Sequence, residues 1–176
     1  MKSSKYQESI LGLIGEIDIV ISNEHAARRY YRSALKLANS QNTRDLFDWL
    51  ANRHAGKVHS LFMRRKKILE GTELSDKTSS MEMGTAGRRN DVWVTAVSHR
   101  ATDLDLYKAA VSNESNAYSD YQRKLTSSDN PLIRKFYLGM VVEQENLMRI
   151  LNERMWHTEV DRAFQGLKAR KLASQS

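Results

Sequence analysis

Apolar residues recur at intervals of three and four along most of the chain, and this spacing limits its fold more than any other feature. Such a spacing places side chains on one face of an α-helix, whereas a strand alternates with a period of two. A single Pro and 8 Gly leave little material for the tight turns of an all-β domain. We therefore predict one all-α domain over residues 1–176, long enough for a self-sufficient core.

The first two predicted helices form a hairpin over residues 5–70. The first runs from about Lys5 to Asn39, and Asn42 or Thr43 can cap the second, which ends near Gly71. The apolar stripes consist of Ile10, Ile14, Ile17, Ile21, Ala27, Leu35 and Ala38 in the first helix and Phe47, Leu50, Val58, Leu61 and Ile68 in the second.

A second predicted hairpin over residues 90–160 follows a polar crossover, residues 71–89, that has no sustained period. One long connection between two helical pairs is a known topology of four-helix bundles. Pro131 suits the first turn of the fourth helix, which continues towards Phe164 and leaves a basic, flexible tail over residues 165–176. The stripes consist of Val94, Val97, Ala101, Leu104, Val111, Ala117 and Leu125, then Ile133, Phe136, Met140, Leu147, Leu151 and Met155.

Composition excludes several classes of function. The absence of Cys excludes disulfides, thiol catalysis, iron–sulfur clusters and Cys-ligated zinc. Acidic residues interrupt the apolar residues near the N-terminus, so we expect a cytoplasmic protein without a membrane span.

The net charge of +7 includes basic clusters at residues 64–67, 88–89 and 168–171. Since none is interleaved with aromatic residues, we interpret them as solvated helix ends, with nucleic-acid binding as a weaker hypothesis.

The two predicted hairpins resemble copies of one another. A shift of ninety residues, without gaps, aligns matching stripe positions and the break between helices, which indicates an internal repeat. The aligned identical residues include Ser22-Asn23-Glu24 with Ser112-Asn113-Glu114, Tyr31 with Tyr121, Leu35 with Leu125, Arg44 with Arg134, and Leu61 with Leu151.

Polar residues interrupt each stripe in mid-helix, namely Glu24, His54, Glu114 and Gln144. Counting from the hairpin turn at about 1.5 Å per residue puts Glu24, His54 and Lys57 at a similar height. If the hairpins pack face to face, these side chains meet in one layer of the core. An isolated carboxylate there is costly unless it is paired or bound to metal.

This pattern resembles the rubrerythrin-like branch of the ferritin-like superfamily. Its half-motif has a helix-one Glu, a Tyr seven residues later, then Phe, Leu-Ala and Glu-x-x-His. The resemblance covers nearly the whole chain and implies a ferritin-like four-helix bundle of two antiparallel hairpins. The motif reads Glu24, Tyr31, Phe47, Leu50-Ala51 and His54-x-x-Lys57 in the first half, and Glu114, Tyr121, Tyr137, Met140-Val141 and Gln144-x-x-Leu147 in the second.

The resemblance also implies a dinuclear iron centre, because in that family the Glu and Glu-x-x-His residues are its ligands. Here only Glu24 and Glu114 keep their identity. Protonated Lys cannot ligate a metal and Leu has no donor atom, so we expect this centre to be lost. The replacements are His54 and Gln144 for carboxylates and Lys57 and Leu147 for imidazoles.

Two interpretations of the core layer stay open. In the first, a metal-free ion cluster forms in which Lys57 pairs with Glu24 or Glu114. In the second, Glu24, His54 and Glu114 hold a single iron, manganese or zinc ion, since two carboxylates and an imidazole suit these metals.

The first interpretation predicts a structural or interaction bundle, a homodimer or the partner of an unknown protein, without cofactor. The second predicts a metal-dependent oxidoreductase or iron-handling protein with an altered ligand set. In either case Tyr31 and Tyr121 can donate hydrogen bonds to the buried Glu residues.

Overall fold

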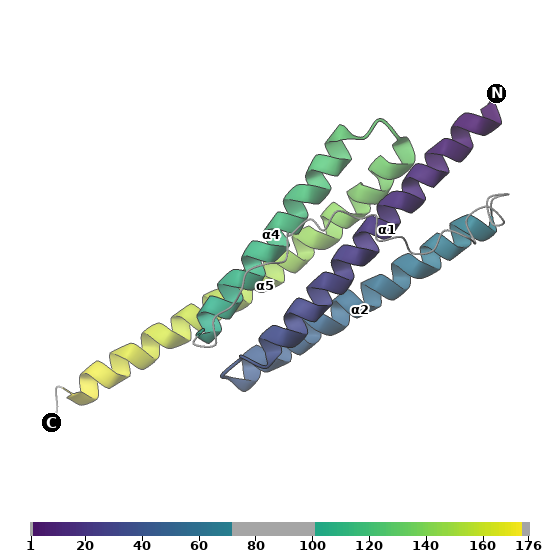
Figure 1. Ribbon diagram of the computed structural model, residues 1–176. Coiled ribbons are helices and arrows are strands. Elements are labelled where there is room, and N and C mark those ends of the chain that lie inside the picture. Colours follow the sequence, from purple (N-terminus) through teal and green to yellow (C-terminus); the bar gives the residue numbers. More distant parts are fainter. Residues whose placement is uncertain (1, 72–100, 174–176) are drawn as a thin grey trace.

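The computed structural model describes residues 2–71 and 101–173, which form four helices and no strand. These helices pack side by side as a bundle, and the C-terminal part of α5 extends beyond the other three (Figure 1). The all-α prediction is confirmed, and no helix in the described ranges is long and apolar enough to cross a bilayer. The helices are α1 (Lys2–Leu35), α2 (Gln41–Glu70), α4 (Asp103–Ser127) and α5 (Pro131–Ala173).

The turn between α1 and α2 differs from its prediction at both ends. The first helix ends at Leu35 instead of Asn39. The cap of α2 is Ser40, not Asn42 or Thr43, because Ser40 is extended and its hydroxyl accepts a hydrogen bond from the backbone N–H of Thr43. Thr43 is already within the first turn and is buried.

The third helix starts later than the stripe pattern suggested. Thr102 caps α4 in a capping box: its hydroxyl accepts from the backbone N–H of Asp105 at 3.3 Å, and the Asp105 carboxylate accepts from the Thr102 N–H at 2.9 Å. Ala101, predicted to be on the helical stripe, therefore precedes the helix. Val94, Val97 and the crossover from residue 72 to 89 lie outside the described residues.

The fourth helix begins at Pro131, as predicted, and continues to Ala173. Residues 165–173, predicted as a tail, are therefore helical. Lys, Arg, Leu and Ala dominate this segment and favour helix, and the lone Gly166 costs only about 1 kcal/mol relative to Ala.

Asp103 joins the start of α4 to the turn between α1 and α2. Its carboxylate oxygens accept hydrogen bonds from the backbone N–H groups of Asn39, at 2.7 Å, and Ser40, at 2.9 Å. Burial would raise the pKa of Asp103, but the bonds from Ser40 and Asn39 outweigh burial and hold the pKa below its ordinary value. The two hairpins are thus linked at this end of the bundle.

The core contains two large apolar clusters at different heights along the bundle. One, nearer the α1–α2 turn, includes Tyr31, Phe47 and Leu147. The other includes Ile17 and Phe136. Between them each helix contributes a buried polar side chain, so the apolar core is divided across its middle.

Replacing Asp103 by Ala should lower the free energy of unfolding by about 1 kcal/mol, since two backbone N–H groups lose a charged acceptor. Urea denaturation measures the difference. Asp129→Ala is the control, because Asp129 lies exposed in the other interhelical turn. Equal stability of the two variants would contradict the proposed link between the hairpins.

Candidate functional site

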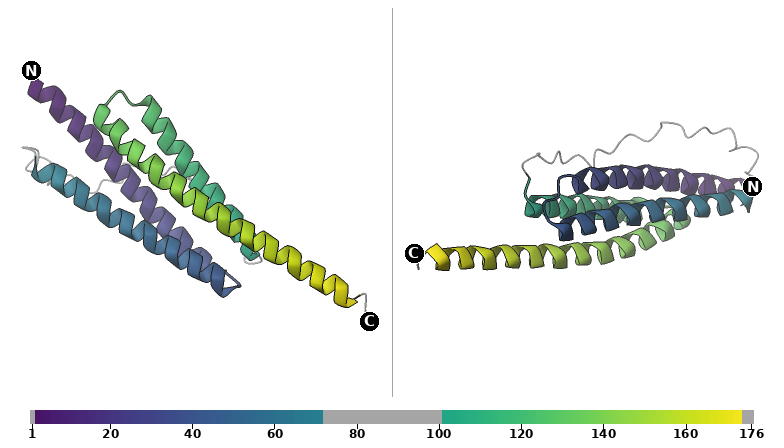
Figure 2. Two further views of the ribbon diagram at one scale, coloured as in Figure 1. Left: turned by 180° about the vertical axis from the view of Figure 1, so that it is seen from behind. Right: turned by 90° about the horizontal axis from the view of Figure 1, so that it is seen from below.

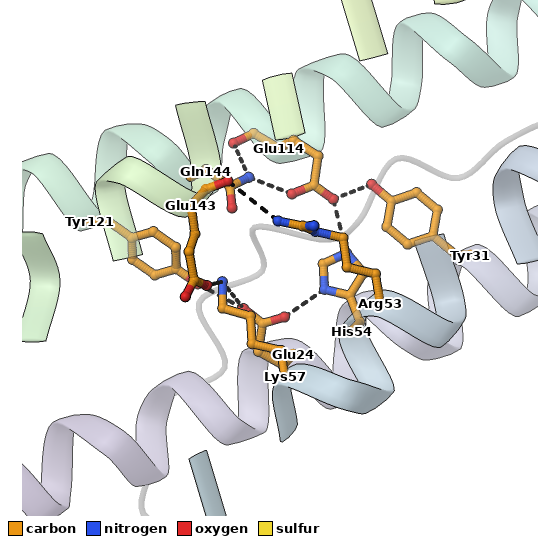
Figure 3. A network of polar contacts seen from close by, with 9 residues as sticks. All are labelled: Glu24, Tyr31, Arg53, His54, Lys57, Glu114, Tyr121, Glu143 and Gln144. Atoms are coloured by element: carbon orange, nitrogen blue, oxygen red, sulfur yellow. Dashed lines mark hydrogen bonds and ion pairs between the residues drawn. The ribbon is translucent and has the colours of Figure 1, made fainter. Parts of the chain in front are cut away.

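The polar side chains that divide the core form one continuous network, named here the polar layer. One polar side chain from each helix is almost completely buried, with 0–3% of its surface exposed: Glu24, His54, Glu114 and Gln144. Each falls between the two apolar clusters on its own helix. The layer brings together all seven residues that the sequence singled out: Glu24, Tyr31, His54, Lys57, Glu114, Tyr121 and Gln144 (Figure 3).

In the first hairpin, Glu24 of α1 contacts two side chains of α2. Nδ1 of His54 lies 2.5 Å from Oε2 of Glu24, and Nζ of Lys57 lies 3.1 Å from Oε1. His54 and Lys57 are three residues apart, so both point from α2 towards α1. The sequence predicted that Lys57 pairs with Glu24 or Glu114, and the structure shows the pair with Glu24.

In the second hairpin, Glu114 of α4 contacts Gln144 of α5. The amide Nε2 of Gln144 donates to the backbone carbonyl of Glu114 at 3.1 Å and also to its carboxylate. Leu147, which corresponds to Lys57, is buried in the adjacent apolar cluster. This half of the layer thus contains a carboxylate but no cation of its own.

Contacts between the hairpins complete the hydrogen bonding of both carboxylates. The Tyr31 hydroxyl of α1 donates to Glu114 of α4, while the Tyr121 hydroxyl of α4 donates to Glu24 of α1 at 3.0 Å (Figure 3). Nε2 of His54 lies 3.2 Å from Glu114. Each hairpin therefore supplies donors to the carboxylate of the other.

The geometry follows the ninety-residue repeat. Within each hairpin, the residue that bonds to Glu follows it by 30 positions: His54 after Glu24, and Gln144 after Glu114. Between hairpins, Tyr31 and Tyr121 exchange partners reciprocally. The repeat seen in the sequence thus corresponds to equivalent contacts in the two halves of the bundle.

The pKa values of the layer are set by burial competing with these contacts. Burial raises the pKa of Glu24, but the Lys57 charge and the contact with His54 outweigh it and lower the pKa to about 2. Burial lowers the pKa of His54, but hydrogen bonds to Glu114 and Glu24 raise it to about 9. Burial and the adjacent carboxylates raise the pKa of Tyr31 and Tyr121 well above the ordinary value. Both tyrosines are therefore neutral donors at pH 7.

With His54 protonated, the layer contains two cations and two carboxylates, so its formal charge is zero. This balance matters because an uncompensated buried charge costs several kcal/mol. Lys57 is the member closest to solvent, with 14% of its side chain exposed. Its ammonium also lies 5.4 Å from the centre of the Tyr121 ring and 3.7 Å from the exposed carboxylate of Glu143.

The polar layer does not fit a dinuclear metal centre. Glu24 and Glu114 contact different nitrogens of His54, so the three side chains do not converge on one point. The Lys57 ammonium lies against Glu24 where the family motif has an imidazole, and Leu147 provides no donor. Among residues 2–71 and 101–173, no group of three or more His, Asp or Glu is arranged to hold a metal ion.

A second polar contact near the layer, centred on Glu16, was not predicted from the sequence. Nζ of Lys124 lies 3.1 Å from both carboxylate oxygens of Glu16, and the Tyr137 hydroxyl donates to Glu16 at 2.7 Å. The equivalent positions in the repeat are Leu106, Ala34 and Phe47, so the repeat gives no signal for this contact.

The sequence matches no protein-family model, no curated protein and no solved structure. The functional conclusion therefore depends on the chemistry of the polar layer and on the surface of the bundle.

Stability should depend on pH through His54 and Glu24. The contribution of protonated His54 is complete below its unfolded pKa of 6.5 and is lost as pH rises to about 9. The contribution of ionised Glu24 is complete above 4.5 and is lost as pH falls towards 2. Urea denaturation from pH 6 to 9 should show a loss on the order of 3 kcal/mol.

His54→Gln is the matched control, because Gln144 occupies the equivalent position in the second hairpin. This variant should show no comparable loss between pH 6.5 and 9. An equal loss in the variant would assign the titration to another group.

Lys57→Met should destabilise the fold by about 3 kcal/mol, because it leaves the buried carboxylates short of one cation. Adding Glu24→Gln should recover part of that loss, since the two changes together preserve charge balance. Glu143→Gln should change stability by less than about 0.5 kcal/mol, because Glu143 is exposed. Additive effects of the Lys57 and Glu24 substitutions would show that the two side chains are not coupled.

Proposed function

We propose that the chain is a ferritin-like bundle of two antiparallel hairpins whose metal centre has been replaced by an ion cluster. The protein then acts as a structural or interaction bundle and not as a metal enzyme. The single observation that supports this proposal is the Lys57 ammonium 3.1 Å from Glu24, within a layer where His54 contacts both carboxylates.

Charge explains how such a layer can persist without metal. In a dinuclear centre, metal cations compensate the inward-facing carboxylates. Here the Lys57 ammonium and the His54 imidazolium compensate Glu24 and Glu114, and the two tyrosines and Gln144 donate the remaining hydrogen bonds. The replacement of one imidazole by Leu147 is tolerable because Gln144 donates to Glu114 without adding charge.

The layer has a further structural role under this proposal. Sliding one hairpin against the other would separate Tyr31 from Glu114 and Tyr121 from Glu24, so each buried carboxylate would lose a hydrogen-bond donor. Apolar contacts alone tolerate such shifts more easily. The polar layer therefore fixes the register of the bundle, a role known for buried polar groups in other helical assemblies.

An alternative is a metal-dependent oxidoreductase or iron-handling protein that holds one ion. It is favoured by the meeting of Glu24, His54 and Glu114 in one layer, with His54 between the carboxylates. Binding an ion would require one nitrogen of His54 to exchange its carboxylate contact for the metal, and would add charge to a balanced cluster.

Elemental analysis of purified protein, with anaerobic titration by iron, manganese and zinc, tests the proposal. The parent should bind far less than one ion per chain. Lys57→His should bind more metal than the parent, because it removes a cation and adds an imidazole, while Glu24→Ala should bind none. Two ions per parent chain would refute the proposal, and one ion, lost in Glu24→Ala, would establish the alternative.

A further inference from the structure

Many of the exposed apolar side chains belong to α2 and to the middle of α5. Figure 2, left, shows these two helices on the near side. Among the residues whose exposure the structure describes, eight large hydrophobic residues are exposed, and five of them belong to these two segments, with 39–53% of their surface accessible. They are Trp49, Phe62 and Met63 of α2 and Leu138 and Val142 of α5.

A small hollow lies between α2 and α5, beside side-chain contacts that join the two helices. The Arg53 guanidinium donates to the carbonyl of Glu143 at 3.4 Å, and the Arg64 guanidinium lies 5.1 Å from the centre of the Phe136 ring. Next to these contacts is a hollow of about 90 Å³, and it shares Ser60 and Arg64 with an open depression of about 430 Å³ further along α2. The two hollows are therefore adjacent on the surface of α2.

We name the two hollows together the α2–α5 groove. The smaller hollow is lined by residues of both helices, namely Lys57, Ser60, Leu61, Arg64, Phe136, Gly139, Met140 and Glu143. The open depression is lined by α2 alone, through Ser60, Met63, Arg64, Lys67 and Ile68. From Lys57 to Ile68 the groove extends over eleven residues of helix, or about 16 Å. A helix of about three turns matches this length. Met63 and Ile68 add apolar surface at its open end.

The groove is cationic. Three of its lining residues are basic, while Glu143 is its only carboxylate and already lies 3.7 Å from Lys57. Within residues 2–71 and 101–173, Arg64 and Lys67 take part in no ion pair. An occupant carrying carboxylates would supply the missing partners.

Gly139 lines this groove from within the continuous helix α5. A Cβ added there would meet no atom within 4 Å, so packing inside the protein does not require Gly. The bare backbone lets an occupant approach α5 closely. Gly15 of α1 is equally exposed and equally free of neighbours, which makes it a matched control.

We propose that the α2–α5 groove binds an acidic amphipathic helix of a partner protein. This inference rests on the proposed interaction function and names the class of partner. Apolar residues of the helix would cover the apolar floor, and flanking Asp or Glu would pair with Arg64 and Lys67.

Nucleic acid is a poorer candidate for the occupant of the groove. The Phe136 ring is buried beneath Arg64 and cannot stack on a base. A second copy of the chain is also a poor fit, because a two-fold interface would oppose the same basic residues from both copies.

Selection from a displayed library of random peptides about 16 residues long, enough for four helical turns, tests this proposal with the full-length chain. Enriched peptides should place Leu, Ile, Met or Phe three and four residues apart, flanked by Asp or Glu. Their affinity, measured by fluorescence anisotropy, should fall at least about tenfold in the double variant Arg64→Glu, Lys67→Glu. Lys66→Glu, on the same helix but outside the groove, should retain binding.

Gly139→Leu should also abolish binding, whereas Gly15→Leu should not, and circular dichroism should show both variants folded. The proposal fails if enriched peptides lack the acidic amphipathic pattern, or if binding is indifferent to Arg64 and Gly139. It also fails if the double variant retains peptide binding but loses the binding of a labelled oligonucleotide. Loss of self-association with peptide binding retained would contradict it in the same way. Metal content is measured separately and tests the proposed function. The proposal for the groove and the proposed function can therefore fail independently.

Discussion

Two buried carboxylates, Glu24 and Glu114, impose the main constraint on this bundle. Each lies in the middle of the core, where an isolated charge would cost several kcal/mol. Each carboxylate has a donor in its own hairpin and a further one in the other hairpin, namely Tyr121 for Glu24 and Tyr31 for Glu114. The hairpins are therefore interdependent: separating them would remove apolar contacts and would also take one hydrogen-bond donor from each buried carboxylate.

The sequence predicted the helices and the membership of the polar layer because both follow from periodicity. A polar residue on an apolar stripe must enter the core, and the repeat places four such residues at matching heights. Helix ends were predicted less well, since Ser40 and Thr102 cap their helices through local backbone geometry that spacing does not encode. The contact of Glu16 with Lys124 was missed because it lies off the repeat and joins residues 108 positions apart.

Lys57 connects the interior of the protein with its surface. Its ammonium contacts Glu24 in the core, while its side chain lines the α2–α5 groove next to Glu143. The pairing of Lys57 with one of the two buried Glu residues was predicted from charge alone. The groove was not predicted, because its formation depends on the separation of α2 and α5. The residue pattern within each helix does not indicate that separation.

The reciprocal contacts of the two halves also bear on how the chain evolved. A single ancestral hairpin with Glu and Tyr at these positions would have assembled as a symmetric pair, each copy completing the other. In such a pair every substitution occurs twice, so a Lys at position 57 would have introduced two buried ammonium groups. In a single chain the two equivalent positions can differ, so Lys57 supplies one ammonium while Leu147 adds none, which is the condition for a neutral cluster.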